Sequence, residues 1–350
     1  MASNDWKDYF VGQNISFGLV FAFVTAILLA GVFYFGPPSL VRPLHEQGTN
    51  LVDELFEKRP RRLDGLMVDR DKVENQPVAI VIGNSEDSLP QDGLSHASVV
   101  YEVPVESSIT RLLAIFSDDI RASSIGTVRS LRPYTLELAE EWQAVLFHAG
   151  GSPQSLEQLA RANVLAINEI SGDGIYFRRD PNREAPHNLF IDSSLIERAF
   201  LAKGIDAPAN FAGWLFKDGD SLAARNNRGN FTERIDIDFG HELSRDIRFR
   251  YNLANNNYTR IVDDQVVLAD GKQLTVDNVI VQQVPIEVID SIGRVDIDLD
   301  GFGKAELYLD GRVTIGTWEK QDGRTYFFDE TGTEVRLNRG RTWVAIVPGN

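Results

Sequence analysis

The sequence contains no cysteine. This absence excludes disulfides, thiolate metal sites, iron–sulfur clusters, a cysteine nucleophile and a lipid attached to an N-terminal cysteine. The Gly-Lys-Ser/Thr phosphate loop and the Gly-x-Gly-x-x-Gly dinucleotide motif are absent too, so no nucleotide or other cofactor is predicted. Positive charge is scarce: 35 Lys and Arg against 51 Asp and Glu give a net charge of −16, which opposes nucleic-acid binding.

Apolar residues, by contrast, are plentiful enough for a folded protein. Of the 350 residues, 43% are hydrophobic and 25% are charged, which is typical of globular chains rather than disordered ones. This length favours about two domains. Without disulfides, burial of apolar side chains must stabilise them.

One long segment carries no charge. It runs from Ile15 to Phe35 and is rich in Phe, Leu, Val and Ala. A helix of this length covers the ~30 Å core of a bilayer and exceeds the ~7–15 apolar residues of a cleaved signal peptide. The sequence therefore predicts a single-pass transmembrane anchor at 15–36 behind a leader at 1–14, with the cytoplasmic membrane as a partner. The positive-inside rule alone leans weakly towards a cytoplasmic location for the rest of the chain.

Three segments are expected after this anchor. Residues 37–68 are charged and interrupted by proline, which indicates a stalk. Residues 69–225 alternate strand and helix patterns, which predicts an α/β domain. Residues 235–350 hold short strand patterns separated by Asp-Gly pairs, which predicts a mainly antiparallel β domain. The elements predicted in 69–225 are strands at 78–82, 98–105, 112–116, 145–148 and 175–177 and helices at 132–143, 153–163 and 193–203.

Two loops of the predicted α/β domain, 126–134 and 147–153, combine glycine with basic residues. Each follows an apolar strand and precedes a helix, so its backbone amides lie at a helix N-terminus, where anions are favoured. Ligands of open α/β sheets bind beyond the carboxyl ends of the strands, so we expect both loops to border a ligand crevice. The residues predicted to line it are Arg111, Arg129, Arg132, Tyr134, His148, Gly150, Gly151 and Ser152.

A third loop, 178–188, adds more cationic side chains. The guanidinium group of arginine can form two parallel hydrogen bonds to a carboxylate or a phosphate. A concentration of arginines in an acidic chain therefore indicates an anionic ligand. The predicted ligand-binding residues of this loop are Arg178, Arg179, Arg183, His187 and Asn188. The alternative is internal ion pairing, of Arg129 and Arg132 with Glu137, Glu140 and Glu141, and of the loop arginines with Asp180 and Glu184.

No catalytic motif stands out. His148, Glu102 and His187 are candidates for acid–base work, because an imidazole or a carboxylate can move protons near neutral pH. Their spacing specifies neither a reaction nor a metal site, so no metal is predicted and the catalytic residues stay unknown. Ser152 lacks the Gly-x-Ser-x-Gly context of a nucleophile elbow.

Several motifs resemble those of one bacterial family, the YerB-like lipoproteins, which are envelope proteins built from two domains of unknown function. The resemblance runs from about Leu63 to Pro348. In the first domain its carriers are Gln76 to Ile80 with Asn84, Pro90 to Ser95, Val100 to Glu102, Ile109 to Arg111, Ile125-Gly126 with Val128 to Ser130, Arg132 to Tyr134, His148 with Gly150 to Pro153, and Ala185 to Leu189. In the second they are Asn278 to Gln282, Gly293-Arg294, Gly316 to Trp318 and Gly340 to Trp343.

The resemblance implies export, with the N-terminus cytoplasmic and the bulk of the chain outside the cell membrane. Two positions depart from the family pattern. The anchoring cysteine is absent, so the 15–36 helix is expected to replace it, and Ser107-Ser108 stands where glycines are expected.

The predicted fold class is an α/β N-terminal soluble domain plus a mainly antiparallel β C-terminal domain, preceded by one transmembrane helix. The predicted function is binding of an anionic envelope ligand, such as a wall polymer or a lipid-linked precursor, through the arginine-rich loops. Two alternatives stay open: an envelope hydrolase or transferase acting on phosphodiester or glycosidic bonds, and a structural or regulatory partner of wall-associated proteins.

Overall fold

The structure is a computed structural model that describes residues 58–349 except 74, 107–108, 220–228 and 241–244. Residues 59–350 group as one compact unit by their contacts. In the described part, the chain forms three α-helices among many strands. The helices are α3 (Pro133–Glu141), α4 (Pro153–Leu159) and α5 (Ser193–Lys203), and the 3-10 turns are η1 (Arg70–Lys72), η2 (Glu86–Ser88), η3 (Leu94–His96), η4 (Glu169–Ser171) and η5 (Gly174–Tyr176).

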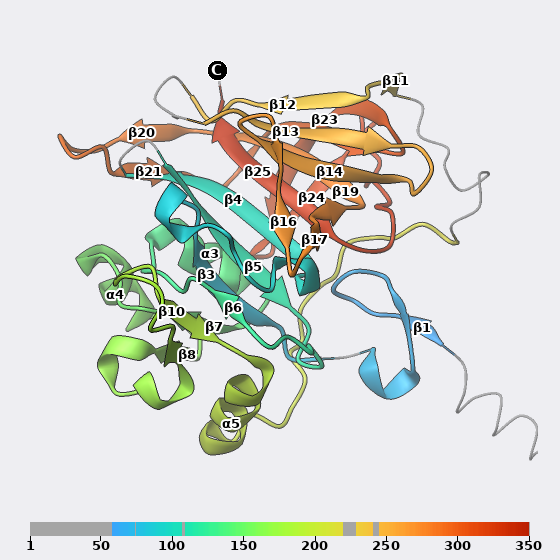
Figure 1. The fold of residues 1–350 in the computed structure, drawn as a ribbon. Helices are drawn as coiled ribbons and strands as arrows, with labels where there is room; N and C mark the ends of the chain where they lie inside the picture. Colours follow the sequence, from blue (N-terminus) through green and yellow to red (C-terminus); the bar gives the residue numbers. More distant parts are fainter. Residues whose placement is uncertain (1–57, 74, 107–108, 220–228, 241–244, 350) are drawn as a thin grey trace, which may run out of the picture. The chain divides into compact units, whose positions relative to one another are not determined.

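One eleven-stranded sheet runs through the unit (Figure 1). Strands from the C-terminal half form one side of it and strands from the N-terminal half form the other. Its order is β11 (Asn230–Phe231), β23 (Arg312–Gln321), β22 (Phe302–Leu309), β19 (Asn278–Val284), β25 (Thr342–Pro348), β4 (Val99–Val105), β5 (Ile109–Phe116), β3 (Val78–Gly83), β7 (Val145–His148) and β8 (Ala166–Asn168), with β24 (Arg324–Phe328) paired to β23.

The two sequence halves meet inside this sheet. Strand β25 pairs parallel to β4, with Thr342 opposite Val99 and Ala345 opposite Glu102. The predicted fold class is therefore wrong, because the two halves share one sheet and the described chain is mostly β with short helices. Both strands read as apolar runs, which predict a strand buried on both faces but carry no information about which distant strand is its neighbour.

The predicted transmembrane segment, 15–36, lies outside the described residues. Across the ranges that the structure describes, no helix is long and apolar enough to span a bilayer.

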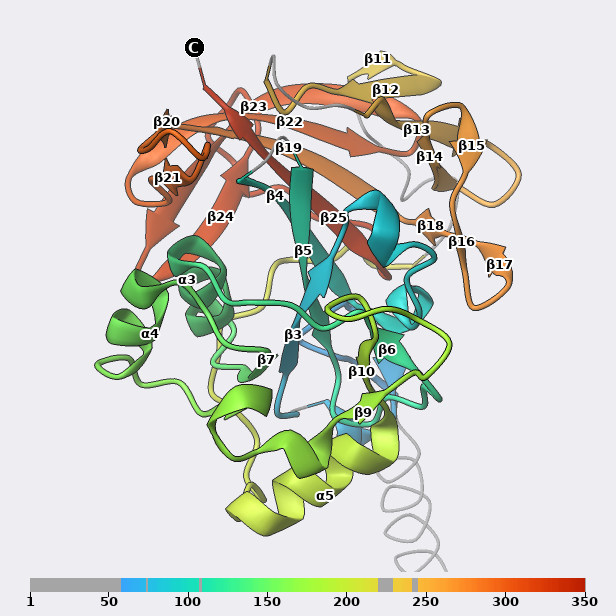
Figure 2. The same ribbon diagram turned by 60° about the vertical axis from the view of Figure 1, so that its left-hand side comes forward.

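Smaller sheets surround the large one. The largest of them has five strands and covers one face of the central sheet (Figures 1 and 2). It consists of β12 (Arg234–Ile237), β13 (Ile247–Asn252), β14 (Asn257–Val262), β15 (Gln265–Val266) and β18 (Thr275–Val276). The others are β1 (Arg59–Pro60) with β2 (Met67–Val68), β6 (Ile125–Gly126) with β10 (Leu189–Ile191) and β9 (Arg178–Arg179), β16 (Leu268–Ala269) with β17 (Lys272–Gln273), and β20 (Ile286–Val288) with β21 (Val295–Ile297).

Alternation along the central strands builds a separate apolar core on each face. In β25, Trp343 and Ala345 join one core while Val344 and Ile346 join the other. The first core includes the five-stranded sheet, where the ring of Phe249 lies 5.7 Å from that of Trp343. The second includes apolar side chains of α3 and the residues that follow it. Successive residues of a strand face opposite sides of the sheet, so each central strand has an apolar core on both of its faces.

Two buried polar clusters join residues from the two halves. In one, Glu102 of β4 is paired with Arg260 of β14, with Nη1 of the arginine 2.9 Å from Oε2 of the carboxylate. In the other, Glu141 of α3 is paired with Arg324 of β24, with Nη1 3.3 Å from Oε2. Buried charges need such partners, so both pairs bind one half of the chain to the other.

Candidate functional site

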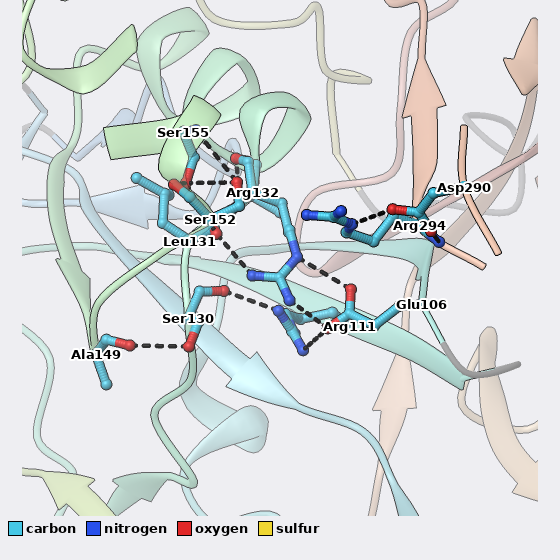
Figure 3. A network of polar contacts seen from close by, with 11 residues as sticks. Glu106, Arg111, Ser130, Leu131, Arg132, Ala149, Ser152, Ser155, Asp290 and Arg294 are labelled. Carbon is cyan, nitrogen blue, oxygen red and sulfur yellow. Dashed lines mark hydrogen bonds and ion pairs between the residues drawn. The ribbon is translucent and has the colours of Figure 1, made fainter. Parts of the chain in front are cut away.

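Two of the predicted arginines share one carboxylate (Figure 3). Arg132 donates from Nε to Oε2 of Glu106 at 3.0 Å, and its Nη2 contacts Oε1 of the same carboxylate. Arg111 of β5 reaches Oε1 of Glu106 from Nη2 at 3.4 Å, and its Nη1 donates to the carbonyl of Ser130 at 2.9 Å. Arg129 lies close enough for its charge to act on Glu106. We refer to Arg111, Arg129 and Arg132 as the arginine cluster.

Backbone hydrogen bonds hold the cluster at the ends of β3 and β7. The amide of Arg129 donates to the carbonyl of Val81 at 2.9 Å, and the amide of Ala149 donates to the carbonyl of Arg129 at 3.0 Å. The segment thus passes between two neighbouring strand ends, as the loop patterns predict. Gly83 makes this approach feasible, because a Cβ there would lie 2.9 Å from Cγ of Arg129 and 2.5 Å from Oγ of Ser88.

Charge is not balanced within the cluster. Burial and the neighbouring charge of Arg132 together lower the pKa of Arg111 to about 10, although the charge of Glu106 opposes them. Burial raises the pKa of Glu106, but the hydrogen bond from Arg132 and the charge of Arg111 outweigh it and lower that pKa overall. Arg129 forms no ion pair with any carboxylate among the described residues. Two guanidinium groups therefore share one carboxylate, and the charge of a third, Arg129, acts on it as well. This local excess of positive charge favours an added anion.

Tyr134 lies in the first turn of α3, beside the cluster. It is buried, and burial raises the pKa of its hydroxyl while the charges of Arg111 and Arg132 oppose that rise. The phenol therefore stays protonated, and its hydroxyl can both donate and accept a hydrogen bond.

The 178–188 loop uses most of its cations internally. Arg178 and Arg183 both stack on the ring of Phe190, at 5.3 and 5.2 Å from its centroid. Arg179 donates to Oδ1 of Asn188 at 2.8 Å and to Oε1 of Glu169 at 2.8 Å. The loop reaches the cluster at one hydrogen bond, from Nη1 of Arg129 to the carbonyl of Pro186 at 3.1 Å.

His187 contacts a side chain that no sequence pattern predicted. Its Nδ1 lies 3.1 Å from Oγ of Ser88, and its Nε2 lies 3.9 Å from Oδ2 of Asp87. Burial lowers the pKa of His187, and the charges of Arg129 and Arg183 lower it further. Ser88 is 0% exposed, so this Ser–His pair has no accessible nucleophile and serves to fix the loop.

Glu102 and His148, the other acid–base candidates, are both fully buried. Glu102 accepts hydrogen bonds from Thr110 at 2.8 Å, from Trp343 Nε1 at 3.0 Å and from Arg260 at 2.9 Å, so its lone pairs are committed. His148 places Nδ1 2.7 Å from the carbonyl of Gly150. The structure therefore separates both residues from the arginine cluster and from solvent.

We predict that His148 makes folding pH-dependent. Burial lowers the pKa of His148. The hydrogen bond to Gly150 and the charge of Asp173 act in the opposite direction but are smaller, so the pKa is lowered overall. Below pH ~6.5 the unfolded imidazole takes up a proton that the folded one does not, so the free energy of unfolding falls as pH falls towards the folded pKa. Urea denaturation at pH 5 to 8 measures this slope.

The matching variant is His148→Gln, which has no titrating group at this position. It should reduce the dependence of the free energy of unfolding on pH. His187, whose pKa is also lowered, preserves part of the slope in that variant. The exposed Gln158 of α4 supplies the control, because Gln158→Ala removes no titrating group and should leave the slope unchanged. An identical slope in wild type and His148→Gln would contradict the prediction.

Gly150, Gly151 and Ser152 of the 147–153 loop make contacts that stabilise the local backbone. Gly150 has φ of 63°, in the left-handed region, and its carbonyl accepts from the amide of Leu131 at 2.9 Å. Ser152 caps α4, where its Oγ accepts from the amide of Ser155 at 3.2 Å. Gly151 lies beside Leu131 in an isolated bridge. These residues thus hold the 129–132 segment in place.

The sequence interpretation considered Glu106 only as a possible base or metal ligand and did not predict its pairing with Arg111 and Arg132. It also did not predict a contribution from the C-terminal half, where the charge of Asp296 of β21 raises the pKa of Tyr134. Among the described residues, no group of three or more His, Asp and Glu side chains could hold a metal ion.

Comparisons with known proteins agree with this fold. The model described as "Protein of unknown function (DUF3048) N-terminal domain" matches residues 63–206, and its C-terminal counterpart matches 235–344. Over 306 residues the chain is 30% identical to "Putative lipoprotein YerB" of Bacillus subtilis (strain 168), covering 86% of this chain and 90% of the relative. The crystal structure of YerB protein from Bacillus subtilis matches with a TM-score of 0.74 and 30% identity, over 83% of this chain and 97% of that chain. The resemblance read from the motifs is therefore confirmed, and the chain belongs to the DUF3048 family of YerB-like proteins, for which the family description gives no function.

Proposed function

We propose that the protein is an envelope protein that binds an anionic polymer through Arg111, Arg129 and Arg132. One observation carries the proposal: the guanidinium groups of Arg111 and Arg132 share the single carboxylate of Glu106, and the charge of a third arginine, Arg129, also acts on it. In a chain of net charge −16, such a local excess of positive charge is what an anionic ligand needs.

The cluster is also pre-organised. Arg111 and Arg132 are held by Glu106 and by backbone carbonyls, so little side-chain freedom is lost when a ligand binds. Arg129 donates to one carbonyl and has no ion-pair partner among the described residues, which leaves N–H groups for phosphate or carboxylate oxygens.

The envelope location is supported by the relative named as a lipoprotein. Because these 350 residues contain no cysteine, they offer no acceptor for a lipid carried on that residue. The location can be measured directly by fractionating cells that express the chain.

We predict that the double variant Arg129→Ala/Arg132→Ala no longer binds anionic cell wall. The assay is co-sedimentation of the 350-residue chain with purified Bacillus subtilis cell wall, before and after chemical removal of its anionic polymers. Wild type should sediment with intact wall and stay in solution with stripped wall. The double variant should bind intact wall at least tenfold more weakly, and added salt should weaken wild-type binding, because screening reduces charge attraction.

The matched control is Arg121→Ala/Arg161→Ala, which removes two exposed arginines and the same amount of charge. It should bind like wild type, and all melting temperatures should be compared. Equal binding by both double variants, or binding of wild type to stripped wall, would overturn the proposal.

A further inference from the structure

A cavity lies between the two halves of the chain, on the face of the central sheet that carries the five-stranded sheet. Its volume is about 340 Å³. The N-terminal half contributes the 84–91 loop and the start of β5, and the C-terminal half contributes β13 to β16. The size falls at the lower end of the ~300–1,000 Å³ typical of small-molecule sites.

The walls of the cavity are mainly apolar. They include Ile247, Val262 and Val266 from the C-terminal half and Leu89 from the N-terminal half. Leu268 also lines it and is 52% exposed, so it lies at the mouth. A ligand with an apolar body would bury its surface here.

One of the polar side chains that line the cavity is ion-paired with the buried Glu102. Arg260 lines the cavity and is only 2% exposed. Its Nη2 donates to Oε1 of Glu102 at 2.9 Å, and its Nη1 lies 2.9 Å from Oε2. Yet Nη1 makes no hydrogen bond of acceptable geometry within the described part of the chain. A buried donor without an acceptor is costly, and an acceptor on a ligand would relieve that cost.

This cavity is separate from the arginine cluster. Thr110 lines the cavity, whereas Arg111, the next residue of β5, belongs to the cluster. Successive strand residues face opposite sides of a sheet, so the two sites lie on opposite faces of β5.

We propose that the cavity is a binding site for a small molecule with an apolar body and one hydrogen-bond acceptor group, such as a sulfonate oxygen, which faces Arg260. The apolar body contacts the walls and the acceptor takes the hydrogen bond that Nη1 offers. This site is additional to the polymer site and does not depend on it.

The test uses two fluorescent probes that share a skeleton. One is 1-anilinonaphthalene-8-sulfonate, which carries an anionic acceptor, and the other is N-phenyl-1-naphthylamine, which carries none. Titrated against the wild-type 350-residue chain, the sulfonate probe should bind at least fivefold more tightly than the neutral probe. No binding of the sulfonate probe, or equal binding of both probes, would overturn the proposal.

Variants locate the bound probe. Val266→Trp fills the cavity and should weaken binding of the sulfonate probe at least tenfold, while Val288→Trp, at an exposed position outside the lining, should not. If Val266→Trp lowers the melting temperature strongly, Leu268→Trp at the exposed mouth decides the question. Binding unchanged in the filling variants would place the probe elsewhere and sink the proposal. Arg129→Ala/Arg132→Ala should still bind the probe, which distinguishes this site from the polymer site.

Discussion

Glu102→Gln is expected to lower the free energy of unfolding by about 3–5 kcal/mol, the cost of breaking a buried ion pair from one side. Glu102 is 0% exposed and balances Arg260, which is 2% exposed. Glutamine has nearly the same shape but no charge, so the guanidinium of Arg260 would stay buried without a counter-ion. The ring of Trp343, 4.2 Å from Cζ of Arg260, offers only partial compensation. Denaturant unfolding of the two proteins measures the difference.

Two controls separate this charge effect from a general loss of packing. Glu197→Gln breaks the exposed pair with Arg121 and should change stability by about 1 kcal/mol or less. The double variant Glu102→Leu/Arg260→Met removes both charges and should lose less than the sum of the single losses, because apolar side chains can replace a buried pair. A loss below about 1 kcal/mol for Glu102→Gln would mean that water reaches Arg260.

Arg324→Met is expected to lower the free energy of unfolding by about 2–4 kcal/mol, because it removes a buried cation that stacks on two tryptophan rings and pairs with one carboxylate. Cζ of Arg324 lies 3.5 Å from the ring centroid of Trp142 and 4.6 Å from that of Trp214. Its Nη1 lies 3.3 Å from Oε2 of Glu141. Lys320, whose Nζ lies 3.6 Å from Oε1 of Glu141, stays in place and limits the loss.

Denaturant unfolding measures the cost of Arg324→Met, and near-UV circular dichroism should report the changed surroundings of the two tryptophans. Arg324→Lys keeps the charge but loses the planar stack, so it should fall between wild type and Arg324→Met. The exposed Arg312 supplies the control, since Arg312→Met should change stability little. Equal stability of Arg324→Met and wild type would contradict the role given to this cluster.

Local patterns predicted many elements well. The apolar run at 78–82 is confirmed as β3, the run at 145–148 as β7, and the helix at 193–203 as α5 with those bounds. The strand predicted at 175–177 is wrong, because Gly174–Tyr176 forms a 3-10 turn. Short apolar segments next to glycine do not distinguish these states, since three residues are too few to establish a period.

The features of the site that the sequence did not predict depend on pairing between residues far apart in the chain. The sequence placed Arg111 and Arg132 in one site, but it could not show that Glu106 would join them. Ion pairing of Arg132 with Glu137 or Glu141 is the alternative that the sequence also allows. In the structure those glutamates pair with Lys320 and Arg324 of the C-terminal half instead. Contacts between the halves depend on the shared sheet, which no local pattern reveals.

The pairing of β25 with β4 constrains how the chain can be made. Thr342 and Val99 are neighbours although 342 − 99 = 243 residues separate them. During synthesis the edge of β4 therefore stays open until nearly the whole chain has left the ribosome. An open strand edge invites pairing with other chains, and closing so long a loop slows folding. The sheet of the N-terminal half is thus completed only after β25 has been made, and we expect a chain truncated before β25 to expose the edge of β4 as an aggregation-prone strand.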